Sequence, residues 1–159
     1  MLNNIFTHSK SADSLCASSL YSNDTFYSAF ERDLRRARRR VVIESPFITS
    51  RRMNHLYPVL MKLKTQGVRI VINTRNPQEH NDEYRIQATT AIELMQAMGI
   101  SVLFTVKHHR KLAIIDDHIL WEGSLNILSQ NDSCEMMRRS QSSQLVDQMV
   151  KFIGVRQYF

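Results

Sequence analysis

Hydrophobic positions along this chain follow two different periods that alternate from one segment to the next. Short apolar runs predict buried strands at 41–44, 68–73, 100–106, 112–115 and 119–121. Between them, apolar residues return at helical spacing, which predicts helices over 23–39, 50–66, 82–98 and from Ser142 or Ser143 onward. Residues 135–139 predict an edge strand. For the third helix, the expected inward face carries Ile86, Leu94 and Met98.

The order of these elements predicts an α/β fold. Strands and helices alternate up to the run at 112–115, which favours crossover connections and a mostly parallel central sheet flanked by helices. A hairpin over 112–121 and a terminal helix complete it. Pro58 lies inside the second predicted helix and should kink or split it. We expect residues 1–22 to form an N-terminal arm or short packed segment and 23–159 to form one domain.

Composition narrows the class of partner. The chain has 159 residues, a net charge of +6 and a pI near 9.6, which favours an anionic partner such as nucleic acid or a membrane surface. No apolar run approaches the length of a membrane span, and the N-terminus is unlike a signal peptide, so we expect a cytoplasmic protein. Cys16 and Cys134 are expected as free thiols, with Cys134 a small buried residue. No metal site is predicted.

The residues best suited to catalysis lie in one stretch, 109–126, which reads HRKLAIIDDHILWEGSLN. Because side chains alternate across a strand, His109 and Lys111 should point to the same face at the start of the run at 112–115. Gly123 should let the backbone come close to a ligand, and Ser124 and Asn126 add small polar groups there. A nucleophile, a fixed cation and two neutral donors suit attack on a phosphodiester.

This stretch resembles the phospholipase D superfamily, whose signature is His-x-Lys-x4-Asp followed by x6-Gly-Ser-x-Asn. Every spacing is met, by His109, Lys111, Asp116, Gly123, Ser124 and Asn126. Residues 43–47 and 121–126 are similar to nuclease-like domains appended to bacterial helicases. The resemblance covers residues 26–153. It implies a phospholipase D-like fold and hydrolysis of single- or double-stranded DNA with neither metal nor cofactor. A helicase or other DNA-processing subunit is a further candidate partner.

The resemblance also implies roles for these residues. His109 would form a phosphohistidine, Lys111, Ser124 and Asn126 would hold the non-bridging oxygens, and Asp116 would order the strand end. Glu135, at the spacing of an acidic residue that supports the histidine in single-motif nucleases, is the candidate acceptor for its other ring nitrogen. The sequence holds no second copy of the motif. Single-motif members form homodimers, so a homodimer that pairs two His109 side chains is expected.

Five arginines end the first predicted helix, namely Arg35, Arg36, Arg38, Arg39 and Arg40. They either contact substrate phosphates or form a solvated helix end that complements the helix dipole, and the sequence leaves both interpretations open. Two alternatives to a nuclease also stay open. One is a phospholipid-hydrolysing or phosphatidyl-transferring enzyme, and the other is a non-catalytic DNA-binding module of the same fold.

Overall fold

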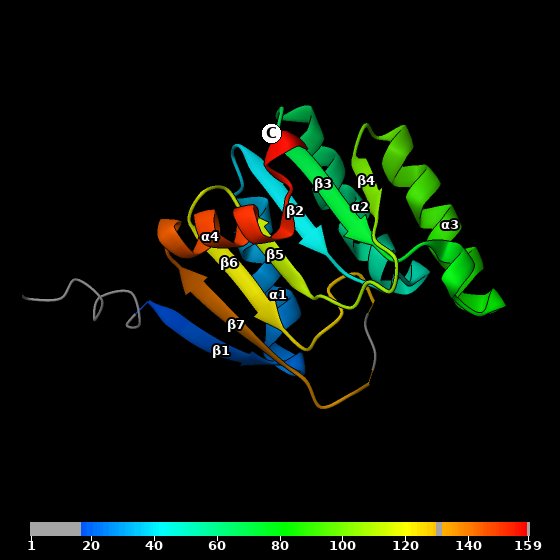
Figure 1. The fold of residues 1–159 in the computed structure, drawn as a ribbon, viewed down its shortest axis with the longest axis horizontal. Coiled ribbons are helices and arrows are strands. Elements are labelled where there is room, and N and C mark those ends of the chain that lie inside the picture. Colours follow the sequence, from blue (N-terminus) through cyan, green and yellow to red (C-terminus); the bar gives the residue numbers. More distant parts are fainter. Residues whose placement is uncertain (1–16, 130–131, 159) are drawn as a thin grey trace, which may run out of the picture.

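The computed structural model describes residues 17–129 and 132–158, which form a seven-stranded sheet with helices on both faces (Figure 1). The α/β fold class is confirmed. The strands are β1 (Ser18–Ser22), β2 (Arg40–Glu44), β3 (Arg69–Thr74), β4 (Ser101–Phe104), β5 (Leu112–Ile115), β6 (Ile119–Gly123) and β7 (Met136–Gln141). The helices are α1 (Asn23–Arg35), α2 (Ser50–Thr65), α3 (Asp82–Ala97) and α4 (Ser143–Ile153), with 3-10 turns η1 (Pro77–Glu79) and η2 (Arg156–Tyr158).

The sheet is mixed, so the expectation of a mostly parallel sheet was wrong. Its strand order is β1-β7-β6-β5-β2-β3-β4. Helical crossovers make β2, β3 and β4 parallel, whereas the loop before β5 and the turns after it reverse the chain, so β5, β6, β7 and β1 pair antiparallel.

The strand predicted at 135–139 is not an edge strand. The structure places β1 outside β7, with Ser18 paired to Ser140 and Ser22 paired to Met136. This edge strand comes from the end of the segment that we expected as an arm. Residues 1–16, including Cys16, lie outside the described residues. Cys134 is exposed, so the expectation that it is buried was wrong.

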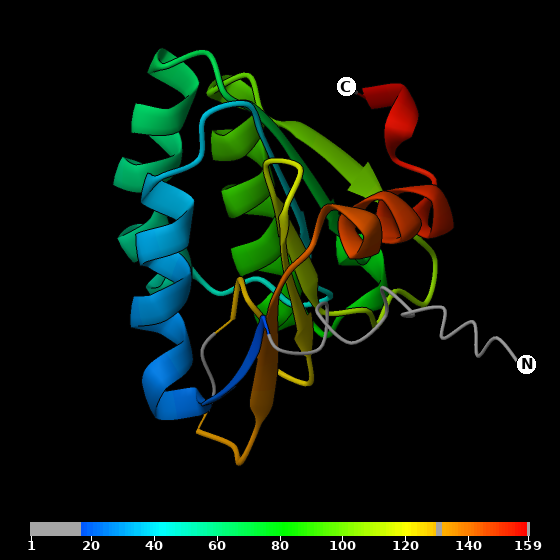
Figure 2. The ribbon, with the colours of Figure 1, turned by 90° about the vertical axis from the view of Figure 1, so that its left-hand side faces the viewer.

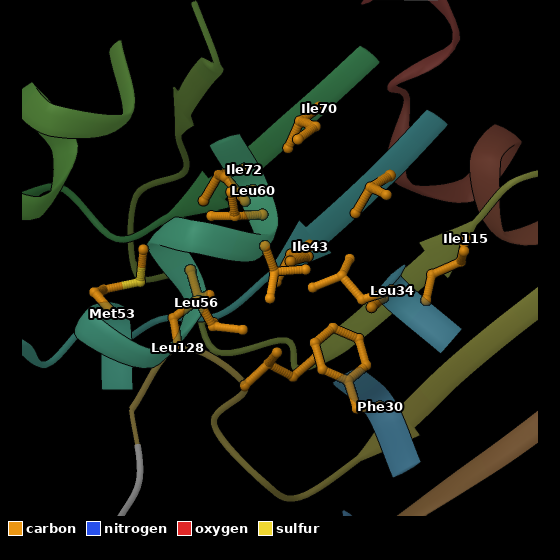
Figure 3. Packing of buried hydrophobic residues seen from close by; sticks show 14 of the residues in the cluster. Phe30, Leu34, Ile43, Met53, Leu56, Leu60, Ile70, Ile72, Ile115 and Leu128 are labelled. Atoms are coloured by element: carbon orange, nitrogen blue, oxygen red, sulfur yellow. The ribbon is translucent and has the colours of Figure 1, made fainter. Parts of the chain in front are cut away.

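Helices α1, α2 and α3 cover one face of the sheet and α4 covers the other (Figure 2). A separate hydrophobic core lies on each face. Alternation along β2 places Val41 and Ile43 in the larger core and Val42 in the smaller one. In the larger core, Phe30 and Leu34 of α1 meet side chains of α2 and of the sheet (Figure 3). No helix in the described part of the chain is long and apolar enough to cross a membrane.

Helix α3 packs through a different face from the one predicted. Ile86 and Leu94 are 65% and 48% exposed, and Met98 is only partly buried. The residues that lie against the core follow the helical pattern i, i+3, i+4 and i+7, and they are Ala88, Ala91, Ile92 and Met95. Two of these contact residues are alanines, whose small side chains let the helix approach the sheet closely. The larger apolar side chains on the other face dominated the pattern and led to the wrong prediction. Helix α2 runs unbroken through Pro58, so the predicted split is absent from it.

Helix α1 ends at Arg35, earlier than predicted, because a carboxylate accepts hydrogen bonds from the backbone N–H groups that follow it. Asp116 lies in the turn between β5 and β6 with a left-handed φ of 54°. Its carboxylate accepts hydrogen bonds from the backbone N–H of Arg38 (3.1 and 3.2 Å), Arg39 (2.8 Å) and Arg40 (3.2 Å). These bonds replace helical ones and direct the chain into β2.

We predict that Asp116→Ala lowers the free energy of unfolding by about 2 kcal/mol or more, because it leaves several backbone donors without their acceptor. The neighbouring Asp117→Ala is the matched control. Asp117 pairs at the surface with Arg39 and Arg40, so its loss should cost about 1 kcal/mol or less. Urea denaturation of both variants measures the difference, and equal midpoints would contradict the structural role of Asp116.

Candidate active site

One cavity of about 500 Å³ brings together most of the candidate catalytic residues. It lies at the edge of the sheet where β2 and β3 end and β5 begins. The residues that line it are His109, Arg110, Lys111, Gly123, Ser124, Asn126 and Glu135. The structure therefore gathers five of the six candidates, and it leaves out Asp116. In open α/β sheets, this edge is where ligands usually bind.

His109 and Lys111 are in direct contact within this cavity. The ammonium of Lys111 donates to the backbone carbonyl of His109 (2.8 Å) and lies 2.9 Å from Nδ1 and 3.4 Å from Nε2 of its ring. This positive charge, followed by partial burial and the charge of Arg75, lowers the pKa of His109. A lower pKa keeps more of the imidazole neutral near pH 7, and only the neutral ring has a lone pair for attack on phosphorus.

Ser124 and Asn126 project from the turn after β6. The Ser124 hydroxyl accepts from the backbone N–H of Met136 (3.1 Å) and lies 3.4 Å from its carbonyl oxygen. The amide oxygen of Asn126 is buried and has no hydrogen-bond partner in the described structure. Buried polar groups are normally paired, so this oxygen is an acceptor open to a donor, whereas contact with an anionic oxygen would fall to the Nδ2 amide group of the same side chain.

Gly123 lines the cavity, and its missing side chain also allows a close contact within the sheet. A Cβ atom there would lie 2.2 Å from the carbonyl oxygen of Met136 and 2.9 Å from the Cα of Met137. The backbone that comes close is therefore that of β7. This contact holds the turn with Ser124 against the strand that follows Glu135.

Glu135 lines the cavity, and its charge raises the pKa of Lys111, although burial lowers that pKa by more. Its carboxylate accepts from the Ser133 hydroxyl (3.3 Å). No hydrogen bond joins Glu135 to His109 among residues 17–129 and 132–158. The supporting role of Glu135 thus stays a prediction.

Several positioning residues were missed in the sequence because their partners are distant in the chain. Glu44, fully buried at the end of β2, accepts from Arg110 through Nε (2.5 Å) and Nη2 (2.9 Å) and from Asn73 Nδ2 (2.9 Å). Arg75, just after β3, donates to the carbonyl of His108 from Nη2 (2.9 Å) and Nε (3.2 Å). Residues at the ends of β2 and β3 therefore hold both neighbours of His109, through the backbone carbonyl of His108 and the side chain of Arg110. A clue in the sequence was their place at strand ends.

A second set of contacts holds the loop that carries Asn126. Arg52 of α2 is buried, and it donates to the carbonyl of Ile127 (3.1 Å) and to Glu31 (2.8 Å). Its guanidinium lies 4.5 Å from the ring centre of Tyr27, whose hydroxyl donates to the Ser129 carbonyl (3.3 Å). Burial raises the pKa of Tyr27 to about 12, so this phenol stays protonated and can keep donating.

The arginine cluster (Arg35, Arg36, Arg38, Arg39 and Arg40) does not reach the cavity. It lies with Asp116 at the opposite end of the strand pair, because Val41 pairs with Ile115 whereas Glu44 pairs with Leu112. Arg39 and Arg40 form ion pairs with Asp117, and Arg35 lies 3.8 Å from Glu31. The structure thus separates these arginines from His109.

No group of three or more His, Cys, Asp or Glu side chains in the described ranges is arranged to hold a metal ion. The chemistry of the cavity rests on a neutral imidazole, an ammonium, a hydroxyl and an amide.

Comparisons with known proteins identify this arrangement. Residues 30–154 match the family model described as cardiolipin synthase, PLD-like domain. No curated protein sequence matches the chain.

Solved structures share the fold. NucT from Helicobacter pylori is 18% identical with a TM-score of 0.68, and the match covers 85% of this chain and 91% of NucT. The phospholipase D family member Nuc from Salmonella typhimurium is 14% identical with a TM-score of 0.71, covering 88% and 94% of the two chains. Phosphatidylserine synthase from Haemophilus influenzae is 14% identical with a TM-score of 0.67, covering 87% of this chain and 36% of the synthase.

We predict that Lys111→Met raises the pKa of His109 toward its ordinary value near 6.5, because the charge that most lowers this pKa is removed. Titration of the imidazole by NMR measures the effect without any assay of activity. Lys107→Met is the control, because Lys107 is exposed and is not among the causes of the shift. A pKa that does not move in Lys111→Met, or moves equally in both variants, would refute this origin.

Proposed function

The chain belongs to the phospholipase D superfamily, and we propose that it hydrolyses phosphodiester bonds of DNA through a phosphohistidine on His109. The observation that carries this proposal is the cavity in which His109 lies beside Lys111, Ser124 and Asn126, which come from the two strands of a hairpin at its open end. Such a set combines a neutral nucleophile with donors for the anionic oxygens of a phosphodiester.

In the first step, a ring nitrogen of His109 attacks phosphorus, and the bond from phosphorus to the leaving oxygen breaks. Lys111, Ser124 and Asn126 hold the two non-bridging oxygens while negative charge shifts among them. The leaving oxygen takes a proton from a general acid. In the second step, water attacks the phosphohistidine, gives its proton to the base left by that acid, and releases His109. A histidine nucleophile of this kind needs no metal ion.

Among the described residues that line the cavity of one chain, no second histidine is present to act as the general acid. The part of the cavity that faces His109 offers Lys111 and Arg110 as cations, and both have other contacts. We propose that a second copy of the chain supplies its own His109 as the acid across a two-fold axis. Glu135 is then the candidate that orients one of the imidazoles.

DNA is the favoured substrate because the chain is basic overall and because a long polyanion could contact cationic residues outside the cavity. We propose that Arg36 and Arg38, whose exposed side chains project from the arginine cluster, touch outlying phosphates. A helicase or other DNA-processing subunit is a candidate partner that would deliver such a strand. A non-catalytic DNA-binding role is disfavoured because every residue of the motif is retained.

Phosphatidyl transfer or phospholipid hydrolysis is the second candidate, because the matching family model is described as a cardiolipin synthase domain. The same nucleophile would attack the phosphodiester of a lipid. Release of a headgroup from phospholipid vesicles, with no cleavage of DNA, would select this function over the nuclease.

We predict that the protein cleaves both DNA and a bis-nitrophenyl phosphodiester in excess EDTA, and that His109→Ala lowers both rates by at least about 1,000-fold. The control is His118→Ala, which removes an exposed histidine at the far end of the same hairpin and should leave both rates unchanged. Loss of activity on chelation, with recovery on adding magnesium, would overturn the mechanism, as would normal cleavage by His109→Ala.

We further predict that mixed dimers of wild type and His109→Ala cleave ordinary DNA at least about 100-fold more slowly than wild type, because they hold a nucleophile but no acid. They should still become phosphorylated by the nitrophenyl diester, whose leaving group needs little protonation. Differently tagged chains allow the mixed dimer to be purified. A monomer that cleaves DNA at a rate linear in protein concentration, with its mass checked by light scattering, would contradict the shared site.

A further inference from the structure

Three aromatic rings gather beside the cavity, and none of them takes part in the chemistry above. Phe47 lies in the loop after β2, His80 follows η1, and Tyr84 is in the first turn of α3. The ring centres of Phe47 and His80 are 5.0 Å apart, those of Phe47 and Tyr84 are 5.4 Å apart, and those of His80 and Tyr84 are 6.3 Å apart. Each ring is only half-buried, so each presents part of its surface to solvent.

One guanidinium joins this aromatic group to the cavity. Arg75 lies 5.4 Å from the ring centre of Phe47, and it also donates to the carbonyl of His108 at 2.9 Å. His109 is the next residue and lines the cavity. The rings and the nucleophile thus lie at the same edge of the sheet, joined through Arg75. All three rings come from segments that follow β2 and β3.

The rings also differ from an ordinary core cluster. They belong to neither of the two hydrophobic cores, and a cation, Arg75, lies over one of them. Burial and the charge of Arg75 lower the pKa of His80, so its imidazole is mostly neutral near pH 7. A neutral heteroaromatic ring, a phenyl and a phenol offer π-faces of the kind on which nucleobases stack.

We propose that Phe47, His80 and Tyr84 form a stacking subsite for an unpaired nucleobase that flanks the phosphodiester in the cavity. This inference rests on the proposed function, because it identifies single-stranded nucleic acid as the substrate class of that same site. Bases within a duplex are already stacked on each other and would first have to be pulled out. Stacking tolerates every base, so the subsite selects unpaired strands rather than a sequence.

The first experiment uses the unmodified aromatic site. Binding is measured by fluorescence anisotropy with His109→Ala protein, which cannot cleave, and with oligonucleotides that differ only in carrying bases or abasic sugars. Matched deoxy- and ribo-oligonucleotides distinguish the two sources of an unpaired base. We expect loss of the bases near the cleavage site to weaken binding by roughly 5- to 150-fold, which corresponds to about 1–3 kcal/mol per stacked base.

The second experiment introduces Tyr84→Ala or Phe47→Leu into the same protein, with Phe152→Ala as the control because that ring is 76% exposed on α4. Each aromatic variant should weaken binding of the normal strand by a similar factor and leave binding of the abasic strand unchanged. The control should change neither. Urea denaturation checks that each variant is folded. If a variant fails to fold, the comparison of normal and abasic strands on protein with intact aromatic residues still tests the subsite.

Base-dependent binding of either the deoxy or the ribo strand supports the subsite, and the strand that shows it identifies the ligand. Equal binding of normal and abasic strands of both types overturns the subsite, as does tighter binding of a duplex than of its separate strands. Failure of the proposed function is a separate result, because it appears as the absence of DNA cleavage by wild type and not as a change in binding.

Discussion

The geometry of the cavity depends on one ion pair, in which the partly exposed guanidinium of Arg110 holds the buried carboxylate of Glu44. Glu44 is completely inaccessible to solvent at the end of the central strand β2, and a carboxylate in that position is costly unless it is paired. The bidentate contact with Arg110, supported by the amide of Asn73, meets that requirement. Because Glu44 holds the side chain of Arg110, the residues on either side of it, His109 and Lys111, lie together and touch each other. The interior of the sheet thereby sets the spacing of the reactive pair.

Much of the fold follows from local patterns, and the departures have identifiable physical causes. The strands from β2 to β6 were predicted because their apolar runs are unbroken, as in Val41–Ile43. The mixed sheet was not predicted, because strand direction depends on how the loop at 105–111 turns and not on any periodicity. Strand β1 was missed because Ser18–Ser22 has little hydrophobic pattern and gains its stability from pairing with β7. Helix α3 was assigned the wrong inward face because two of its large aliphatic side chains, Ile86 and Leu94, face solvent.

The active site divides in the same way. The family motif predicted that His109, Lys111, Ser124 and Asn126 act together, and they do line one cavity because the hairpin brings its two strands side by side. Their supports were not predicted, because each depends on a contact across the fold. Glu44 and Arg110 are separated by 66 residues, Arg75 and His108 by 33, and Arg52 and Ile127 by 75. Asp116 belongs to the motif by spacing but acts at the other end of β5, on the backbone of Arg38–Arg40.

The position of Asp116 has a consequence for how long a bound strand must be. It anchors the arginine cluster seven residues from His109, which is about 20 Å along an extended chain. If the proposed contacts between DNA and the arginine cluster form, the substrate must reach across this distance. At the rise of about 3.4 Å per nucleotide along a duplex this is roughly six nucleotides, and an extended single strand would need fewer. The two separated sets of contacts would then hold an intact strand more firmly than a shorter product that keeps only one of them.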